Sequence, residues 1–96
     1  MCQLDRLQNL RSEIYRIAQK HKAEKIYVFG SCARKEEQSG SDIDFLVEFN
    51  GASLFDHVRL EDELSEYLQT PVDVVSSKAL RQDQFGKRVR REMVSL

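Results

Sequence analysis

The sequence predicts one α/β (α+β) domain, a small mixed β-sheet with helices in the order α-β-α-β-α-β-α. Three observations support this. The chain has 96 residues, enough for one hydrophobic core, so residues 1–96 are expected to form a single domain. Helical and strand-like hydrophobic periods alternate along it. The connection between the first two strands is short, which favours antiparallel pairing. About 20 residues with a helix join the second strand to the third, which favours a parallel crossover.

The first elements follow from hydrophobic spacing. Residues 4–22 are expected to form one amphipathic helix, because apolar residues recur at steps of three and four. Residues 25–29, "KIYVF", are β-branched and aromatic and are expected to form a strand that ends at Gly30. Residues 33–37 are expected to add one or two helical turns. The apolar residues that define the first helix are Leu4, Leu7, Leu10, Ile14, Ile17 and Ala18.

Residues 42–49 alternate between apolar and acidic side chains, as in a strand with one buried face. The buried face is expected to carry Ile43, Phe45, Val47 and Phe49. The Asn50-Gly51 pair that follows is a turn signal.

The second half of the chain continues the alternation. Ser53 is expected to cap a helix that runs to about Gln69, with Asp56 as its reciprocal partner. Pro71 cannot continue that helix, and residues 72–77, "VDVVSS", are expected to form a third strand. Ser77 is expected to cap a last helix over about 78–94. The residues expected to be buried on the longer helix are Leu54, Val58, Leu64 and Leu68.

Composition excludes several classes of protein. The net charge is −1, so no overall field draws the chain to nucleic acid or to a membrane surface, and direct nucleic-acid binding is not expected. The apolar runs are too short to span a bilayer, and the first residues lack the pattern of a secretion signal. Cys2 and Cys32 lie far apart, which favours a reduced, cytoplasmic protein but leaves their pairing open.

Three aspartates are the candidate functional residues. Asp42 and Asp44 are two apart on the second strand, so their side chains point to one side. Asp73 lies near the start of the third strand. If the two strands are parallel neighbours, the three carboxylates gather at one end of the sheet. Such carboxylates repel one another, and a divalent cation relieves that repulsion. Oxygen ligands without histidine or cysteine suit Mg²⁺ or Mn²⁺ rather than zinc.

Gly30 and Ser31 lie at the end of the first strand, which antiparallel pairing brings to the same end of the sheet. Gly30 allows the backbone to approach a phosphate closely, and Ser31 adds a hydroxyl and an N–H before a helical turn. Taken singly, a Gly-Ser turn or an Asp-x-Asp edge is usually only structural. Together, at this spacing and with a third acid on another strand, they predict a phosphate-binding turn facing a metal site.

The stretch "FGSCARKEEQSGSDIDFLVEF" resembles the Gly-Ser-x10-Asp-x-Asp signature of the DNA polymerase beta nucleotidyltransferase superfamily, and "PVDVVS" resembles the strand that supplies its third carboxylate. The small size is similar to that of the minimal nucleotidyltransferases (MNT). The resemblance implies the nucleotidyltransferase fold and transfer of AMP from ATP onto a hydroxyl. Proteins of this kind are commonly partnered with a small helical HEPN protein as antitoxin and toxin, and the acceptor is then a tyrosine of the toxin.

Carried over by position, the resemblance implies that Gly30, Ser31 and Arg34 bind the nucleotide. Asp42, Asp44 and Asp73 would be the catalytic and metal-binding residues for two Mg²⁺ (or Mn²⁺) ions, with Asp73 also helping to deprotonate the acceptor. The implied reaction is a two-metal displacement. Two alternatives stay open: a non-catalytic antitoxin that neutralises a helical partner by contact, and a small-molecule nucleotidyltransferase. The sequence leaves open the nucleotide base, the partner's identity and whether the protein forms an oligomer.

The C-terminal segment is locally basic, with six basic residues against Asp83 and Glu92. A solvated helix face is the default interpretation. A sharper interpretation is a patch for an acidic partner, or for RNA bound by that partner. The basic residues are Lys78, Arg81, Lys87, Arg88, Arg90 and Arg91.

Overall fold

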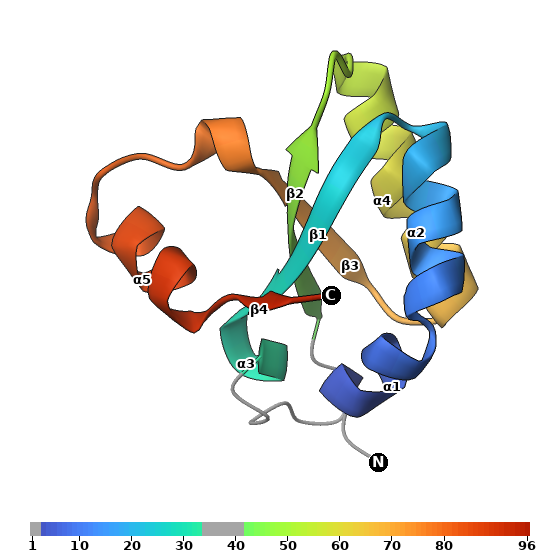
Figure 1. Cartoon of the computed structure of the whole chain (residues 1–96), viewed down its shortest axis with the longest axis horizontal. Helices are drawn as coiled ribbons and strands as arrows, with labels where there is room; N and C mark the ends of the chain where they lie inside the picture. The colour runs from blue at the N-terminus through green and yellow to red at the C-terminus, as the bar shows by residue number, and fades with distance from the viewer. Residues whose placement is uncertain (1–2, 34–41) are drawn as a thin grey trace.

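The computed structural model of the chain describes residues 3–33 and 42–96. These residues contain one four-stranded sheet with the strand order β3-β2-β1-β4 (Figure 1). Among the described residues, no helix is both long and apolar enough to cross a membrane. The elements are α1 (Gln3–Asn9), α2 (Arg11–Lys20), β1 (Ala23–Phe29), α3 (Gly30–Ala33), β2 (Ile43–Phe49), α4 (Leu54–Leu68), β3 (Val72–Ser76), a 3₁₀ turn (Ser77–Ala79), α5 (Gln84–Glu92) and β4 (Val94–Ser95).

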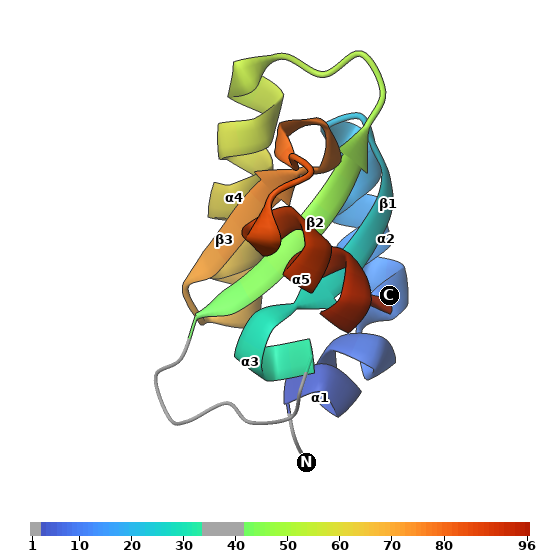
Figure 2. The ribbon, with the colours of Figure 1, turned by 90° about the vertical axis from the view of Figure 1, so that its left-hand side faces the viewer.

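The sheet confirms both predicted pairings. β1 and β2 are antiparallel, with Phe29 opposite Asp44, and β2 and β3 are parallel, with Asp44 opposite Asp73. α2 and α4 cover one face of the sheet and α5 lies on the other (Figures 1 and 2). The mixed α/β architecture predicted from the sequence is therefore correct.

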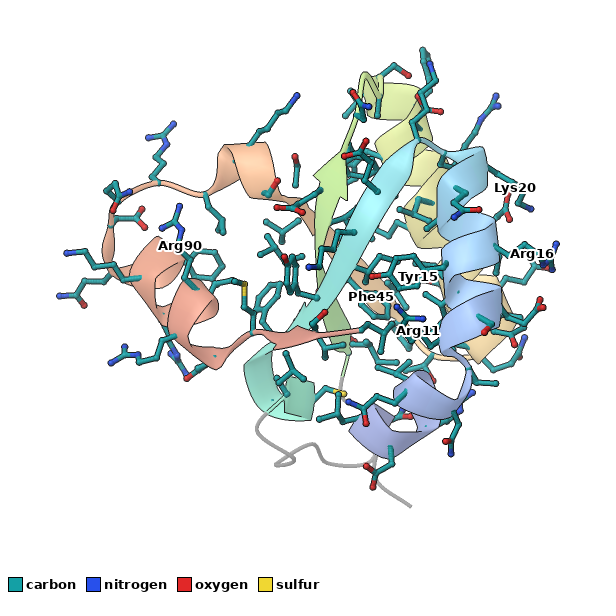
Figure 3. All side chains as sticks on the ribbon, in the orientation of Figure 1. Arg11, Tyr15, Arg16, Lys20, Phe45 and Arg90 are labelled. Atoms are coloured by element: carbon teal, nitrogen blue, oxygen red, sulfur yellow. The ribbon has the colours of Figure 1, made fainter. Side chains whose placement is uncertain are left out.

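The main core lies between the sheet and α1, α2 and α4. Ile43, Phe45 and Val47 point into it from β2, as the alternation predicted, and Phe49 packs at its edge. Figure 3 shows Phe45 between the strands and the helices, while Arg16 and Lys20 lie on the outer side of α2. The hydroxyl of Tyr15 accepts a hydrogen bond from the backbone N–H of Ile26 at 3.0 Å, which ties α2 to β1.

The predicted helix over residues 4–22 is two helices, because the chain breaks at Leu10. Leu10 has φ −97° and ψ 9°, outside the helical region. Its N–H still bonds the carbonyls of Arg6 and Leu7, both at 3.1 Å, so the break is tight. Leu4 and Leu7 of α1 and Ile14 of α2 remain in one core, which is why the periodicity survives the break.

α4 begins as predicted, but buries a different set of residues. The Ser53 N–H donates to Asp56 Oδ2 at 2.9 Å and the Asp56 N–H donates to Ser53 Oγ, a capping box. The helix buries Leu60, Leu64 and Leu68. The predicted burial of Leu54 and Val58 was wrong, because these two residues are 77% and 49% exposed.

Side chains of α4 also close the outer edge of β3. The N–H groups of Val72 and Val74 donate to Ser65 Oγ at 3.1 Å and to Glu61 Oε2 at 2.9 Å. His57 Nε2 donates to the carbonyl of Val74 at 2.7 Å. An edge strand with open backbone groups invites pairing with other chains, and these bonds occupy that edge.

The C-terminal segment differs most from the prediction. Instead of one helix over 78–94 capped by Ser77, a 3₁₀ turn capped by Ser76 precedes α5, whose N-cap is Asp83. A Cβ on Gly86 would overlap the carbonyl oxygen of Arg81, so the chain folds back closely before α5. After α5, β4 pairs with β1, an additional strand that the sequence analysis missed. A short helix, α3, spans Gly30–Ala33; of the helical turn predicted over 33–37, residues 34–37 lie outside the described residues, so that turn stays a prediction.

Candidate active site

Gly30 stands where β1 ends and α3 begins, and two features of the site require glycine. Its φ of +75° is a conformation that other residues rarely adopt. A Cβ built at this position would lie 2.5 Å from Asp44 Oδ2. The backbone of Gly30 and the carboxylate of Asp44 are therefore in close approach, on the neighbouring ends of β1 and β2.

A cavity of about 320 Å³ opens beside this contact. Gly30, Ser31 and Asp44 form one wall, so the structure brings three predicted site residues together. α3 is held at this place by Cys32, which is buried in the main core. The cavity is lined by Phe29, Gly30, Ser31, Asp44, Phe85, Arg88, Val89 and Glu92.

The other predicted acids lie close to Asp44 along the sheet. Asp73 is the register partner of Asp44 on the parallel strand β3, so the two side chains leave the same face of the sheet. Asp42 directly precedes β2 and is exposed. Over residues 3–33 and 42–96, no three histidine, cysteine or acidic side chains stand close enough together to hold a metal ion. The three-carboxylate site stays a prediction, and Arg34 lies outside the described residues.

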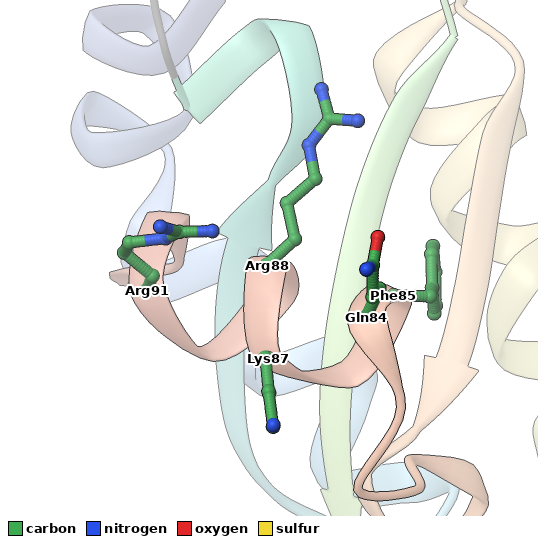
Figure 4. A pocket seen from close by; sticks show the side chains of 5 residues that line it. All are labelled: Gln84, Phe85, Lys87, Arg88 and Arg91. Carbon is green, nitrogen blue, oxygen red and sulfur yellow. The ribbon is translucent and has the colours of Figure 1, made fainter.

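α5 contributes residues that the sequence analysis did not place in the site. Phe85, Arg88 and Glu92 line the same cavity as Gly30 and Ser31. Arg88 and Phe85 also line a second cavity of about 360 Å³ with Gln84, Lys87 and Arg91. In Figure 4, Arg88 extends from α5 toward β1 and α3, whereas Lys87 points the opposite way. The local excess of basic residues was the only sequence signal, and it could not single out Arg88.

Comparison with known proteins identifies the family. The family described as polymerase beta nucleotidyltransferase matches residues 12–96. This chain belongs to that family. It is 43% identical over 75 residues to a Methanocaldococcus jannaschii protein provisionally named protein adenylyltransferase MJ0435, covering 77% of this chain and 81% of that protein. It is 40% identical over 70 residues to protein adenylyltransferase MntA of Thermococcus cleftensis, covering 72% of this chain and 70% of that protein.

Solved structures agree with this assignment. One provisionally described as a minimal nucleotidyltransferase superposes with a TM-score of 0.84 at 37% identity, covering all of this chain and 97% of that one. A second is the MNT antitoxin in complex with a tri-AMPylated Shewanella oneidensis HEPN toxin. It has a TM-score of 0.67 at 21% identity, covers 92% of this chain and 69% of that one, and shows the shared fold alone. The predicted family and the nucleotidyltransferase class of enzyme are confirmed.

Proposed function

We propose that this protein transfers AMP from ATP to a tyrosine hydroxyl of a small helical HEPN toxin, and so acts as its antitoxin. The observation that carries the proposal is the contact between Gly30 and Asp44, with Asp73 opposite Asp44 in the sheet. The names of the relatives support a protein acceptor. The name MntA is also that of one component in a solved structure of the toxin–antitoxin pair MntA-HepT, which supports the kind of partner.

Each predicted site residue has a proposed role. The backbone of Gly30 and the hydroxyl and N–H of Ser31 bind the triphosphate, with Arg34 as a further ligand. Asp42 and Asp44 bind two metal ions, and Asp73 binds one of them and faces the acceptor. We propose that residues 1–96 act as a single catalytic domain in the cytoplasm.

We propose Mg²⁺ or Mn²⁺ as the metal, because carboxylate oxygens are the donors that such hard cations prefer. Asp44 presents a carboxylate oxygen to the Gly-Ser turn, and Asp73 leaves the same face of the sheet. The eight described residues that line the cavity include neither histidine nor cysteine that would favour zinc. When bound, two such ions would neutralise phosphate charge and lower the pKa of the acceptor hydroxyl.

The proposed step is a displacement at the α-phosphorus of ATP. The acceptor oxygen forms a bond to this phosphorus, and the bond to the oxygen bridging the α- and β-phosphates breaks. Pyrophosphate leaves with that electron pair, and the hydroxyl proton passes to the carboxylate of Asp73. The walls of the cavity hold the nucleotide in line with the acceptor, which lowers the entropic part of the barrier.

The test is label transfer from α-³²P-ATP to a purified helical protein encoded beside this chain, with Mg²⁺ or Mn²⁺. The wild type should label a tyrosine of the partner and release pyrophosphate, and γ-labelled ATP should leave the partner unlabelled. Asp73→Asn should keep nucleotide binding but reduce transfer by about 10²–10⁴-fold, the usual contribution of general-base catalysis. Asp62→Asn, an exposed position on α4, is the matched control and should behave as wild type.

Other outcomes separate the alternatives. Label arriving from the γ-phosphate would make the reaction a kinase reaction and reject the proposal. Tight binding of the partner without any transfer would favour an antitoxin that acts by contact alone. Transfer only to small molecules would favour the alternative of a small-molecule nucleotidyltransferase. Full transfer by Asp73→Asn would show that another group accepts the proton.

A further inference from the structure

Arg88 is the one cation among the described lining residues of the Gly30–Asp44 cavity. The other described residues of that cavity are apolar or polar, apart from the acidic Asp44 and Glu92. Lys87 and Arg91 lie on the same helix and line the second cavity, without lining the first. Of the four basic residues of α5, which are Lys87, Arg88, Arg90 and Arg91, only Arg88 lines both cavities.

The packing of α5 fixes Arg88 relative to the Gly-Ser turn. Val89, the next residue, is buried against Phe29 and Leu46 of the sheet. The rings of Phe85 and Phe29 meet edge to face at 6.3 Å and 84°. Phe29 directly precedes Gly30. The same side chain that ends β1 thus anchors the helix that carries Arg88.

The simplest alternative is that Arg88 only supports α5. Its Nε lies 3.3 Å from Glu92 Oε1, one helical turn away, and the two side chains are 59% and 22% exposed. An exposed pair at this spacing contributes little to helix stability. The orientation of Arg88 toward β1 and α3, rather than along the outer face with Lys87, is not needed for that pair (Figure 4).

We propose that Arg88 binds the β- and γ-phosphates of the nucleotide, which leave as pyrophosphate. This inference rests on the proposed nucleotidyl transfer. The reacting α-phosphate must lie near the aspartates, and Arg88 stands on the wall formed by α5, where the rest of the triphosphate would extend. A guanidinium offers planar paired donors that match phosphate oxygens, and it keeps its charge at any physiological pH. Glu92 holds the guanidinium at the cavity and yields it when phosphate binds.

The first experiment measures binding of ATP and of AMP to the full chain by calorimetry with Mg²⁺. Arg88→Ala should weaken ATP binding about tenfold, the usual effect of losing a charged hydrogen bond, and leave AMP binding unchanged. Arg88→Lys keeps the charge but loses the paired donors, so its affinity for ATP should lie between those of the wild type and Arg88→Ala. Arg91→Ala removes the same charge from the same helix, at a position that does not line the Gly30–Asp44 cavity, and should change ATP affinity less than twofold.

Several results would overturn the inference. If Arg88→Ala and Arg91→Ala lowered ATP affinity equally, Arg88 would contribute only through its positive charge and not through a direct contact. An equal loss of ATP and AMP affinity would place Arg88 away from the terminal phosphates. In both cases the proposed nucleotidyl transfer would stand, provided that the wild type binds Mg·ATP. Failure of the wild type to bind Mg·ATP at all would remove both proposals.

A second variant tests the same contact in the opposite direction. Glu92→Gln removes a carboxylate that pairs with Arg88 and repels phosphate, so Mg·ATP and pyrophosphate should both bind more tightly, by a few-fold. The gain should be smaller in the double variant with Arg88→Ala, because only the relief of repulsion remains when no guanidinium is left to release. Weaker binding in Glu92→Gln, or a gain that is equally large without Arg88, would contradict the proposed role. Circular dichroism of each variant checks that α5 remains folded.

Discussion

The two faces of the sheet are built very differently. Among the described residues, 18 buried residues form the cluster between the sheet and α1, α2 and α4. The cluster between the sheet and α5 has only three buried residues, Phe29, Leu46 and Val89. The candidate active site opens on the second face, where α5 leaves a cavity beside Gly30 and Asp44. The first face therefore supplies most of the stability, and the second buries few residues and leaves room for a ligand.

The largest expected effect on stability comes from the first face. Phe45 is fully buried, and Phe45→Ala should lower the free energy of unfolding by about 3–5 kcal/mol, because it removes apolar contacts and leaves a cavity. Urea unfolding followed by circular dichroism measures this change. A loss below 1 kcal/mol would mean that the large cluster does not carry the fold.

A smaller loss is expected from the second face. Val89→Ala removes two methyl groups from the contact between α5, Phe29 and Leu46, and should cost about 1–2 kcal/mol. The same variant should also weaken ATP binding by the molecules that remain folded, because α5 forms one wall of the cavity. Unfolding and calorimetry together test this. Unchanged ATP affinity would show that the site does not depend on how α5 packs.

The sequence predicted the first face well, because its elements repeat a simple period. Alternation identified Ile43, Phe45 and Val47, and local side-chain chemistry identified the capping box of Ser53. The failures on α4 are geometric. Val58 and Leu64 are six residues apart, so they lie about 120° apart around a helix and cannot share one buried stripe. Counting helical turns from Leu64 would have selected Leu60 and Leu68 instead.

The second face was harder to predict, because its contacts join distant segments. β4 has two residues, too few to show a period, and its pairing with β1 depends on the turn that precedes α5. Gly30, Ser31 and Asp44 could be predicted to meet from strand order alone. The place of Arg88 in the same cavity could not, since it depends on how Val89 and Phe85 pack on Phe29. Local sequence gives only the excess of positive charge.

A pH-dependent contribution is expected where α2 meets α4. Glu63 accepts hydrogen bonds from Lys20 Nζ at 2.9 Å and from His21 Nε2 at 2.8 Å. These bonds lower the pKa of its carboxyl, and the bond from Lys20 has the larger effect. A lowered pKa means that this stability is fully present above the ordinary glutamate pKa of 4.5, and is lost as the pH falls through the lower value of the folded state.

Glu63→Gln should therefore be less stable than wild type at pH 7, and the difference should shrink as the pH falls below about 4.5. The effect should be smaller than that of Val89→Ala, because the carboxylate is partly exposed and solvent screens it. Glu13→Gln is the control, since it removes the same charge from the exposed pair of Glu13 and Arg16 within α2. Urea midpoints between pH 3 and 8 measure both variants. A constant difference at all pH values would exclude ionisation as its cause.

The smallest effect on stability should come from the residues proposed to bind metal. Asp42→Asn with Asp44→Asn keeps the side-chain shapes, leaves the apolar face of β2 intact and removes repulsion between carboxylates, so the unfolding free energy should stay equal or rise slightly. The same variant should lose the Mg²⁺-dependent part of ATP binding, which a chelator should abolish in wild type. Thermal unfolding and calorimetry with and without Mg²⁺ measure the two quantities separately.

An unfolding midpoint lowered by many degrees would show that the aspartates are structural, and that stability and catalysis do not depend on different faces of the sheet. Unchanged Mg²⁺-dependent binding would instead place the metal on other residues. Retained stability with lost binding is the result expected if the second face evolved around a ligand, since carboxylates held side by side cost stability unless a cation occupies them.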